Sequence, residues 1–447
     1  MIVSDAFRGK RFALLGLARS GLATLDTLVA SGASCIAWDN REEAREAVRD
    51  RAEIGDPMEI DLANVDGLIV SPGVPLNRHP VAERARAAGC PIIGDIELFA
   101  MARHSLPAHR VVGITGTNGK STTTALIHHM LQYSGIASLM GGNIGLPILS
   151  QEPLPEGGVY VLELSSYQID LTYSLDCDVA VLLNITPDHL DRYDGYAGYC
   201  ASKARLFAMQ SPGHYRVVGA DSADAMAAVA GLSNVIEVTT GAIDAGEQAG
   251  WPSLQGPHNA QNAAAALAVG AALRLDFDTV LASFATYSSL PHRMERVAEA
   301  NGVLFVNDSK ATNPASTAPA LAAYPRIHWI VGGLPKGDGL EECAPHFGHV
   351  VHAYTIGEAG PAFASLLEAE MPVTRAEMMC EAVRAAMANA KPGEVVLLSP
   401  ACASFDQFRD FEARGDYFRQ IVEALLSGDE SACAAVETAP APKGDAA

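Results

Sequence analysis

Residues 111–130, VVGITGTNGKSTTTALIHHM, decide more about this chain than any other stretch. Val111 and Val112 suit a buried strand, and the residues after Ser121 carry the apolar spacing of a helix. The glycine-bounded loop between them points backbone N–H groups and the positive end of a helix at a phosphate. The stretch therefore predicts a nucleoside triphosphate site.

The loop departs from the general phosphate-loop spacing, because Ile114 stands where the first glycine belongs and Gly113 comes one residue early. A glycine-rich turn with a surface lysine is the plain alternative, but strand, loop, Lys-Ser pair and helix coincide here. Lys120 is expected to reach the β- and γ-phosphates, and the Ser121 hydroxyl to bind Mg²⁺. The expected phosphate contacts are Gly116, Thr117, Asn118, Gly119, Lys120, Ser121, Thr122 and Thr123.

Composition excludes several classes of protein. The formal net charge of −21 disfavours nonspecific binding to nucleic acid or to anionic membranes, since both rely on clustered Lys and Arg. Eight cysteines include no C-x-x-C pair, which favours reduced, packed thiols in a cytoplasmic protein. Charges interrupt the N-terminal stretch, and no uncharged apolar run approaches ~18–20 residues. Neither a signal peptide nor a transmembrane helix is expected.

Strand and helix patterns alternate along the chain, which at 447 residues is too long for one ordinary core. Alternation predicts an α/β fold with right-handed, parallel sheets throughout. We predict three α/β domains, over residues 1–106, 107–292 and 293–428, with the phosphate loop and a mostly parallel sheet in the central one. The remaining residues, 429–447, have little to bury and are expected to be disordered.

The first strand–helix–strand unit carries the turn Gly16-x-Ala18-x-x-Gly21, a dinucleotide fingerprint with alanine at the central glycine. Asp39 ends the next strand, near the place of a ribose-binding acid. Taken alone, this unit leaves NAD(P) binding and an oxidoreductase open. Another strand stops at Ser71, and ligands of open parallel sheets bind at such strand ends.

Two segments of the predicted central domain offer metal ligands. Glu163 ends a strand, and a carboxylate there can hold Mg²⁺ directly or through water. The run NITPDHLDRY, residues 184–193, places His189 between two aspartates after another strand. An exposed loop carboxylate and a structural histidine are the plain alternatives.

The last third of the chain offers further groups at strand ends. Arg293, beside His292, can stabilise charge on a transferring phosphoryl group, and Asp308 can hold a ribose hydroxyl. Lys336 lies in another glycine loop, and Ser404 follows the last long strand. Each of these could equally be an ordinary sheet-end loop.

These segments occur in the order typical of the Mur ligases, and TGTNGKS, NITPDHLDRY and SPACASFDQFRDFEARG resemble that family's motifs over nearly the whole chain. The resemblance implies an ADP-forming, ATP-dependent acid–amino-acid ligase of peptidoglycan precursor synthesis, with two Mg²⁺ ions. It also implies that the first and third domains are Rossmann-like and bind the UDP substrate and the amino acid. The last segment is closest to the glutamate-adding branch. That implies D-glutamate addition to UDP-N-acetylmuramoyl-L-alanine through an acyl phosphate, by a cytoplasmic monomer.

The resemblance also implies a role for individual residues. UDP-substrate contacts are expected from Arg19, Ser20, Asp39, Asn40, Ser71, Gly73, Asn143 and His189. ATP contacts outside the loop are expected from Asn259, Asn262, His292, Arg293 and Asp308, and D-glutamate contacts from Thr312, Lys336, Ser404 and Phe411. The catalytic residues are expected to be Lys120, Glu163, His189 and Lys203, and the metal ligands Ser121, Glu163, His189 and Lys203 as its carbamate.

Composition alone would make Lys203 a solvated helix lysine. Three alternatives for the whole chain stay open at this point. One is another ligase of the superfamily, such as a folylpolyglutamate synthase or an L-glutamate-adding enzyme. The others are an NAD(P)-binding oxidoreductase and a catalytically silent nucleotide-binding partner.

Overall fold

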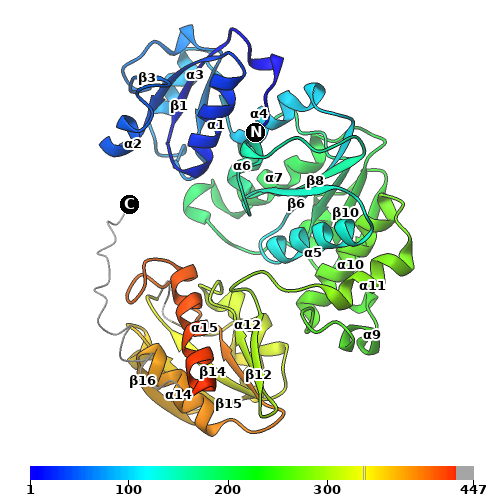
Figure 1. The fold of residues 1–447 in the computed structure, drawn as a ribbon, viewed down its shortest axis with the longest axis vertical. Helices are drawn as coiled ribbons and strands as arrows, with labels where there is room; N and C mark the ends of the chain where they lie inside the picture. The colour runs from blue at the N-terminus through cyan, green and yellow to red at the C-terminus, as the bar shows by residue number, and fades with distance from the viewer. Residues whose placement is uncertain (336, 338, 429–447) are drawn as a thin grey trace. The chain divides into compact units, whose positions relative to one another are not determined.

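The computed structural model describes residues 1–335, 337 and 339–428, so Lys336 and the expected disordered segment 429–447 lie outside the described residues. The strands form three open sheets (Figure 1). The chain folds into two compact units: residues 1–242 with 261–284, and residues 243–260 with 285 onward. The predicted three-sheet α/β architecture is confirmed, while the exact domain boundaries stay predictions.

The N-terminal sheet has the order β3-β2-β1-β4-β5, with every pair parallel. Its strands are β1 Arg11–Leu15, β2 Ser34–Trp38, β3 Glu53–Ile54, β4 Gly67–Val70 and β5 Ile92–Ile93. Its helices are α1 Arg19–Ala30, α2 Glu42–Glu46, α3 Val81–Ala87 and α4 Asp95–Ala102. The predicted fingerprint unit is therefore β1–α1–β2.

The second sheet has the order β11-β10-β9-β6-β8-β7 and is also parallel. Its strands are β6 His109–Thr115, β7 Ser138–Gly142, β8 Gly158–Glu163, β9 Val179–Leu182, β10 Tyr215–Gly219 and β11 Val235–Val238. The helices of this region are α5 Lys120–Tyr133, α6 Ser166–Asp170, α7 Gly195–Ala208, α8 Ala223–Ala227, α9 Ala245–Ala249, α10 Pro257–Ala272 and α11 Phe277–Thr286. The phosphate loop joins β6, an inner strand, to α5.

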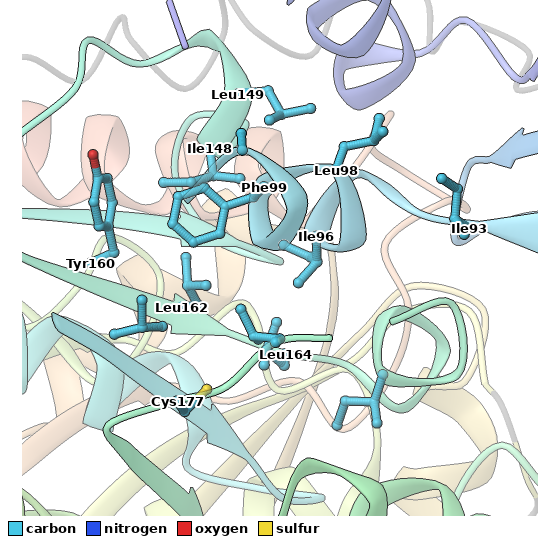
Figure 2. Close-up of a cluster of buried hydrophobic side chains, with 14 of the residues drawn as sticks. Ile93, Ile96, Leu98, Phe99, Ile148, Leu149, Tyr160, Leu162, Leu164 and Cys177 are labelled. Carbon is cyan, nitrogen blue, oxygen red and sulfur yellow. The ribbon is translucent and has the colours of Figure 1, made fainter. Parts of the chain in front are cut away.

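The first two sheets share one hydrophobic core, which joins them into a single unit (Figure 2). Ile96 and Phe99 of α4 are fully buried with Tyr160 and Leu162 of β8. The rings of Phe99 and Tyr160 meet edge-on with centroids 5.0 Å apart. Burying each such side chain stabilises a fold by about 1.5–3 kcal/mol.

Gly113 has a packing role rather than the loop role that the sequence suggested. It lies inside β6, where an added Cβ would come within 2.7 Å of the Cys177 Sγ. The left-handed or otherwise glycine-favouring backbone of the loop begins only at Gly116, with φ of 152°. The loop is therefore shorter than a reading from Gly113 implies.

The sheet of the second unit has the order β12-β13-β17-β14-β15-β16. Its strands are β12 Glu295–Ala300, β13 Val303–Asn307, β14 Ile327–Gly332, β15 Val350–Ile356, β16 Val373–Glu377 and β17 Val395–Leu398. Its main helices are α12 Pro314–Ala322, α13 Gly360–Leu367, α14 Met379–Asn389 and α15 Phe411–Ser427. In the described part of the chain, no helix is long and apolar enough to cross a membrane.

The prediction of parallel sheets throughout is wrong at one edge, where β12 pairs with β13 in antiparallel fashion. The two strands are joined by Asn301 and Gly302, with φ of 53° and 77°. Asn-Gly with positive φ at both positions is the signature of a two-residue hairpin turn. This local signal overrode the strand–helix alternation.

Candidate active site

The phosphate loop is a tight turn closed by its own lysine. Gly119 has φ of 84° and caps α5, which starts at Lys120. The Lys120 Nζ donates to the carbonyl oxygens of Gly116 and Thr117 at 2.9 and 2.8 Å. Ser121 and Thr122 follow in the first helical turn, and Ser121 is buried. The amine thus lies over the loop, where a bound phosphate would meet it.

Asn184 holds the loop from the end of the neighbouring strand β9. Its carbonyl accepts from the Thr117 N–H at 2.9 Å, and its Oδ1 accepts from the Asn118 N–H at 2.9 Å. Its Nδ2 donates back to the Asn118 carbonyl at 3.1 Å. Sequence reasoning placed Asn184 only in the metal-binding run. The adjacency of β9 and β6 could have indicated its structural role.

Asn262 lies against the loop from helix α10. The Thr123 hydroxyl donates to the Asn262 Oδ1 at 3.1 Å. A Cβ added at Gly119 would come within 2.4 Å of the same oxygen. Among the expected ATP contacts outside the loop, Asn262 is the one that the first unit itself brings to the phosphate-binding turn.

Lys203 is buried against the same loop, so the expectation of a solvated lysine from composition is wrong. Its side chain is 2 % exposed. Its Nζ donates to the Gly116 carbonyl at 2.8 Å and lies 4.6 Å from the ring centroid of Tyr199. Burial, and then the charge of Lys120, lower the pKa of Lys203 well below its usual range. Burial at this position therefore disfavours the charged ammonium form of Lys203.

Glu163 ends β8 as predicted and is almost fully buried. Its Oε1 accepts from the Asn143 Nδ2 at 3.0 Å. Its Oε2 has no hydrogen-bond partner within the described residues, and neither do the buried hydroxyls of Thr115 and Thr124. A buried carboxylate oxygen without a partner is costly unless something binds it. A cation beside the phosphate loop would satisfy it.

The protein supplies few ligands to such a cation. Over residues 1–335, 337 and 339–428, no three His, Cys, Asp or Glu side chains are grouped so that they could hold a metal ion. Mg²⁺ commonly takes one or two carboxylates and completes its shell with phosphate oxygens and water. The residues present therefore fit magnesium bound together with a nucleotide better than a metal site formed by protein alone.

His189 stands in a strained loop beside the phosphate site. It has φ of 52°, and its Nε2 lies 3.5 Å from the Asp188 Oδ2. Burial lowers the pKa of His189; the charges of Lys120 and Lys203 lower it further, against the pull of Asp188. The lowered pKa favours the neutral imidazole, which keeps a lone pair for a metal or a substrate.

The strand ends of the N-terminal sheet bring the other expected residues together. Asp39 accepts the Leu17 N–H at 2.8 Å and pairs with Arg41. Burial alone raises the pKa of Asp39, but the bonds from Arg41 and Leu17 outweigh it and lower the pKa. Arg41 was missed by sequence reasoning, although it stands two residues after Asp39.

Two contacts of this N-terminal site reach further. The Ser71 hydroxyl donates to the Gly16 carbonyl at 3.2 Å, in the fingerprint turn. The Arg19 Nη2 donates to the Gly145 carbonyl at 3.1 Å, two residues after Asn143. Ser20 and Ser71 line the same small cavity. The Gly73 carbonyl accepts a hydrogen bond from Arg192, and the Asn40 carbonyl accepts one from Arg45.

In the second unit, His292 and Asp308 form a buried polar cluster. The His292 Nδ1 lies 3.1 Å from the Asn307 Nδ2. Asp308 accepts the Met294 N–H at 3.1 Å and the Ser399 hydroxyl at 2.8 Å. Burial raises the pKa of Asp308 to about 7. Asn259 is also buried in this unit and donates to the Gln255 carbonyl at 3.0 Å.

Backbone strain marks the turn that carries Arg293. Its two neighbours, His292 and Met294, have φ of 62° and 47°. Left-handed backbone at two non-glycine residues costs roughly 1–3 kcal/mol each and tends to occur at functional sites. Bonds from the N–H groups of His292 to Glu295 and of Met294 to Asp308 hold the turn.

Two of the expected glutamate-binding residues follow neighbouring strands of the second unit's sheet, while Lys336 lies outside the described residues. Thr312 follows β13 and Ser404 follows β17, and these strands are parallel neighbours. The Lys310 Nζ lies 3.6 Å from the ring centroid of Phe411. Sequence reasoning missed Arg414, which is buried and donates to Ser309 and to the carbonyls of Cys402 and Ala403. An internal Arg in a helix gave no signal of this.

Fold and site together define a P-loop protein with a buried acid, a buried lysine and a histidine beside the loop. Three family models match the chain: the Mur ligase MurD-like N-terminal domain over residues 10–94, the Mur ligase middle domain over 114–251, and the Mur ligase glutamate ligase domain over 292–402. The chain belongs to the Mur ligase family.

Curated relatives are similar over almost their whole length. The UDP-N-acetylmuramoylalanine–D-glutamate ligase of Novosphingobium aromaticivorans is 66% identical, covering 97% of this chain and 99% of the relative. The enzyme of that name from Zymomonas mobilis is 54% identical, covering 95% and 100%. The corresponding ligase of Caulobacter vibrioides is 41% identical over 97% and 100%.

Solved structures agree on the fold at much lower identity. UDP-N-acetylmuramate–alanine ligase of Thermotoga maritima superposes with a TM-score of 0.57 at 16% identity, covering 94% of this chain and all of that one. A ligase of Acinetobacter baumannii that acts on UDP-N-acetylmuramoylalanyl-D-glutamyl-2,6-diaminopimelate has a TM-score of 0.57 at 15% identity, covering 95% and 92%. At these identities the match speaks for the fold alone.

Proposed function

We propose that this chain is an ATP-dependent ligase that joins D-glutamate to UDP-N-acetylmuramoyl-L-alanine in peptidoglycan precursor synthesis. The observation that carries the proposal is the phosphate loop on which Lys120, Lys203 and Asn262 converge. The strong full-length similarity to D-glutamate ligases supports the choice of substrates. ADP and phosphate are the proposed co-products.

The nucleotide is bound by the loop and by the positive end of α5. Because Asn184 accepts the N–H groups of Thr117 and Asn118, the N–H groups that follow them at the start of α5 are proposed to bind the phosphates. Lys120 is proposed to leave its two carbonyl acceptors and bind the phosphates as well. Further nucleotide contacts are proposed for Asn259, His292, Arg293 and Asp308, which belong to the second unit.

Two magnesium ions are proposed beside the phosphates, where they would lower the charge on the transferring phosphoryl group. Glu163 offers its unpartnered Oε2, Ser121 its hydroxyl and His189 its neutral imidazole. The fourth proposed ligand is Lys203 as a carbamate, formed when the neutral amine attacks CO₂ and releases one proton. The lowered pKa of Lys203 supports this, because only the unprotonated amine can react.

The proposed reaction proceeds in two steps. The alanyl carboxylate attacks the γ-phosphorus of ATP, the bond to the β–γ bridging oxygen breaks, and an acyl phosphate and ADP result. The D-glutamate amine then attacks the acyl carbon, loses a proton and expels phosphate. Lys120 holds the phosphoryl oxygens in both steps, and His189 and Asn143 orient the substrate arm that carries the carboxylate.

The UDP end is proposed to bind at the strand ends of the N-terminal sheet. Arg19, Ser20, Asp39, Asn40, Ser71 and Gly73 gather there. The match of a MurD-like N-terminal domain to residues 10–94 favours a UDP substrate over NAD(P) at this fingerprint. The D-glutamate side is proposed to use Thr312, Ser404 and Phe411, with Lys336 outside the described residues.

Phosphate release measured with ATP, Mg²⁺ and UDP-N-acetylmuramoyl-L-alanine tests the proposal. Release is expected with D-glutamate and not with L-glutamate or without the UDP substrate. Equal release with L-glutamate would make the chain an L-glutamate-adding ligase, and release with a folate substrate a folylpolyglutamate synthase. NADH binding without phosphate release would indicate an oxidoreductase. Absence of both phosphate release and NADH binding would indicate a catalytically silent nucleotide-binding partner.

A cytoplasmic location belongs to the same proposal, because ATP and UDP-linked precursors are made inside the cell. A monomeric state is also proposed. Cell fractionation tests the location. Size-exclusion chromatography with light scattering tests the monomer, and a mass of twice 46.9 kDa would contradict it.

A further inference from the structure

Arg192 ties the strand-end loop of the N-terminal sheet to the loop that carries His189. Its Nη1 donates to the Gly73 carbonyl at 3.3 Å. Its Nη2 donates to the carbonyls of Pro72 at 3.2 Å and of Val74 at 2.9 Å. One guanidinium therefore binds three consecutive carbonyls of the loop that holds the proposed UDP contacts.

A face of the same guanidinium is stacked on an aromatic ring. The Arg192 Cζ lies 4.3 Å from the centroid of the Tyr167 ring. The Tyr167 ring in turn contacts the His189 ring, with centroids 5.2 Å apart. A continuous set of contacts thus runs from the loop at Gly73 through Arg192 and Tyr167 to His189.

A second set of bonds joins the same two segments. The Asn77 Nδ2 and the Arg78 Nη2 both donate to the Asp191 carbonyl, at 2.9 and 3.0 Å. All these residues belong to the first compact unit. The segments 72–78 and 189–192 are therefore fixed to each other at two points, with Arg192 making most of the bonds.

We propose that Arg192 is a positioning residue that couples binding of the UDP substrate at residues 71–73 to magnesium and nucleotide binding at His189. This inference rests on the proposed function. When a ligand orders the 71–73 loop, the three carbonyls fix the guanidinium plane, which orders Tyr167 and then His189. Linkage makes the effect reciprocal, so magnesium nucleotide tightens UDP-substrate binding by the same factor.

Arginine is required for this role because lysine cannot reproduce it. The planar guanidinium offers several donors in fixed directions and a flat face for the ring, whereas an ammonium is a compact point charge. Arg192→Lys keeps the charge and loses the geometry. Arg84→Lys is a matched control, because Arg84 also donates to two carbonyls, those of Pro57 and Ile60, remote from the proposed contacts.

The experiment measures UDP-N-acetylmuramoyl-L-alanine binding by calorimetry, with and without Mg²⁺ and a non-hydrolysable ATP analogue. In the unmodified protein the analogue is expected to tighten binding severalfold. In Arg192→Lys this factor is expected to fall towards one, and the KM for the UDP substrate to rise about tenfold. The KM for D-glutamate and the behaviour of Arg84→Lys are expected to stay within about twofold of the unmodified protein.

Tyr167 provides an independent second test. Tyr167→Phe keeps the ring and is expected to keep the coupling, while Tyr167→Leu is expected to lose it as Arg192→Lys does. The inference is overturned if the unmodified protein shows no coupling, or if Arg192→Lys or Tyr167→Leu retains it with an unchanged unfolding temperature. Failure of the unmodified protein to bind the UDP substrate at all would instead overturn the proposed function.

Discussion

The side-chain amine of Lys203 lies 2.8 Å from the carbonyl oxygen of Gly116, so helix α7 brings a buried lysine to the turn that binds phosphate. Two lysines, Lys120 and Lys203, thereby share the Gly116 carbonyl as an acceptor. Their mutual repulsion and burial disfavour a second ammonium. Converting one of them into an anion removes that repulsion.

Lys203→Ala is expected to be nearly inactive, because the proposed carbamate ligand is lost. Short carboxylic acids are expected to restore part of the rate by taking the place of the carbamate, as measured by phosphate release. Lys120→Ala serves as the control, since its loss is not repaired by a carboxylate. Near-normal activity of Lys203→Ala, or absence of a labelled carbamate carbon by NMR after exposure to ¹³CO₂, would contradict the modification.

Lys120→Ala is expected to lower kcat by about 10²–10³, the usual loss when one charge contact to the reacting group is removed. UDP-substrate binding is expected to remain largely intact, because the Lys120 amine lies on the phosphate loop, where it donates to the carbonyls of Gly116 and Thr117. Steady-state kinetics and calorimetry separate the two effects. A variant that keeps more than about a tenth of the rate would contradict the assignment of Lys120 to phosphoryl transfer.

Glu163→Gln and His189→Ala are expected to raise the Mg²⁺ concentration needed for half-maximal activity. Glutamine keeps the shape of Glu163 and an acceptor for Asn143, but removes the charge from the unpartnered oxygen. Magnesium titrations of the rate check this. Asp176→Asn, a change at a carboxylate that binds Ser211 and His214 away from the loop, is the control. Unchanged titrations in both variants would leave Glu163 and His189 as structural residues.

Gly119→Ala is expected to abolish ATP binding for two reasons. The added Cβ would lie only 2.4 Å from the Asn262 Oδ1, and alanine would have to adopt a backbone φ of 84°. Gly135→Ala is the matched control at the other end of α5. Gly135 has φ of 74° with open space around its Cβ, so only the backbone cost of about 1–2 kcal/mol is expected. ATP binding and thermal unfolding distinguish the two. Equal ATP affinity in both variants would show that Asn262 yields to the methyl group.

Asp308 makes stability depend on pH in the opposite sense to an acid whose pKa is lowered by folding. Burial raises its pKa to about 7 in the fold, against an ordinary value near ~4. The folded state therefore holds a proton that the unfolded chain has released. The contribution is fully present below about pH 4, falls as pH rises to about 7, and totals up to about 4 kcal/mol.

Asp308→Asn is expected to flatten the dependence of unfolding free energy on pH between about 4 and 7, as measured by denaturant titrations. The asparagine Oδ1 can still accept the Met294 N–H, so the turn at Arg293 is kept. Glu394→Gln is a contrasting control, because the pKa of Glu394 is lowered to about 2. Burial raises this pKa, but the hydrogen bonds from His328 and Arg326 lower it by more. If the unfolding free energy of Asp308→Asn varies with pH as that of the unmodified protein does, Asp308 is not the group that binds the extra proton in the folded state.

The sequence predicted those elements whose local signals agree with their tertiary role. The strand before the phosphate loop, helix α5 and the strand end at Glu163 appear where apolar periodicity and turn residues indicated. The hairpin at Asn301 was missed although its Asn-Gly turn is a strong local signal, because alternation of strands and helices was given priority.

The rest of the site depends on distances that no local pattern contains. Lys203 lies 87 residues from Gly116 and Arg414 lies 105 from Ser309, yet each pair is hydrogen-bonded in the fold. Only the family resemblance indicated a role for Lys203, and its burial was not predicted. The roles of Tyr167, Asn184 and Arg192 as supports for neighbouring loops depend on which strand ends lie side by side, which the topology alone decides.

The antiparallel strand β12 also settles how the second unit's sheet ends. An open strand edge offers unpaired backbone groups to any extended chain, including another copy of the protein. Here the outermost strand is interrupted by a bulge between Arg296 and Ala298, and Arg296 and Glu299 pair across it at 3.0 Å. A chain arriving at this border would have to displace charges and follow an irregular register. The hairpin thus protects the sheet from growing into an aggregate by strand addition at that side.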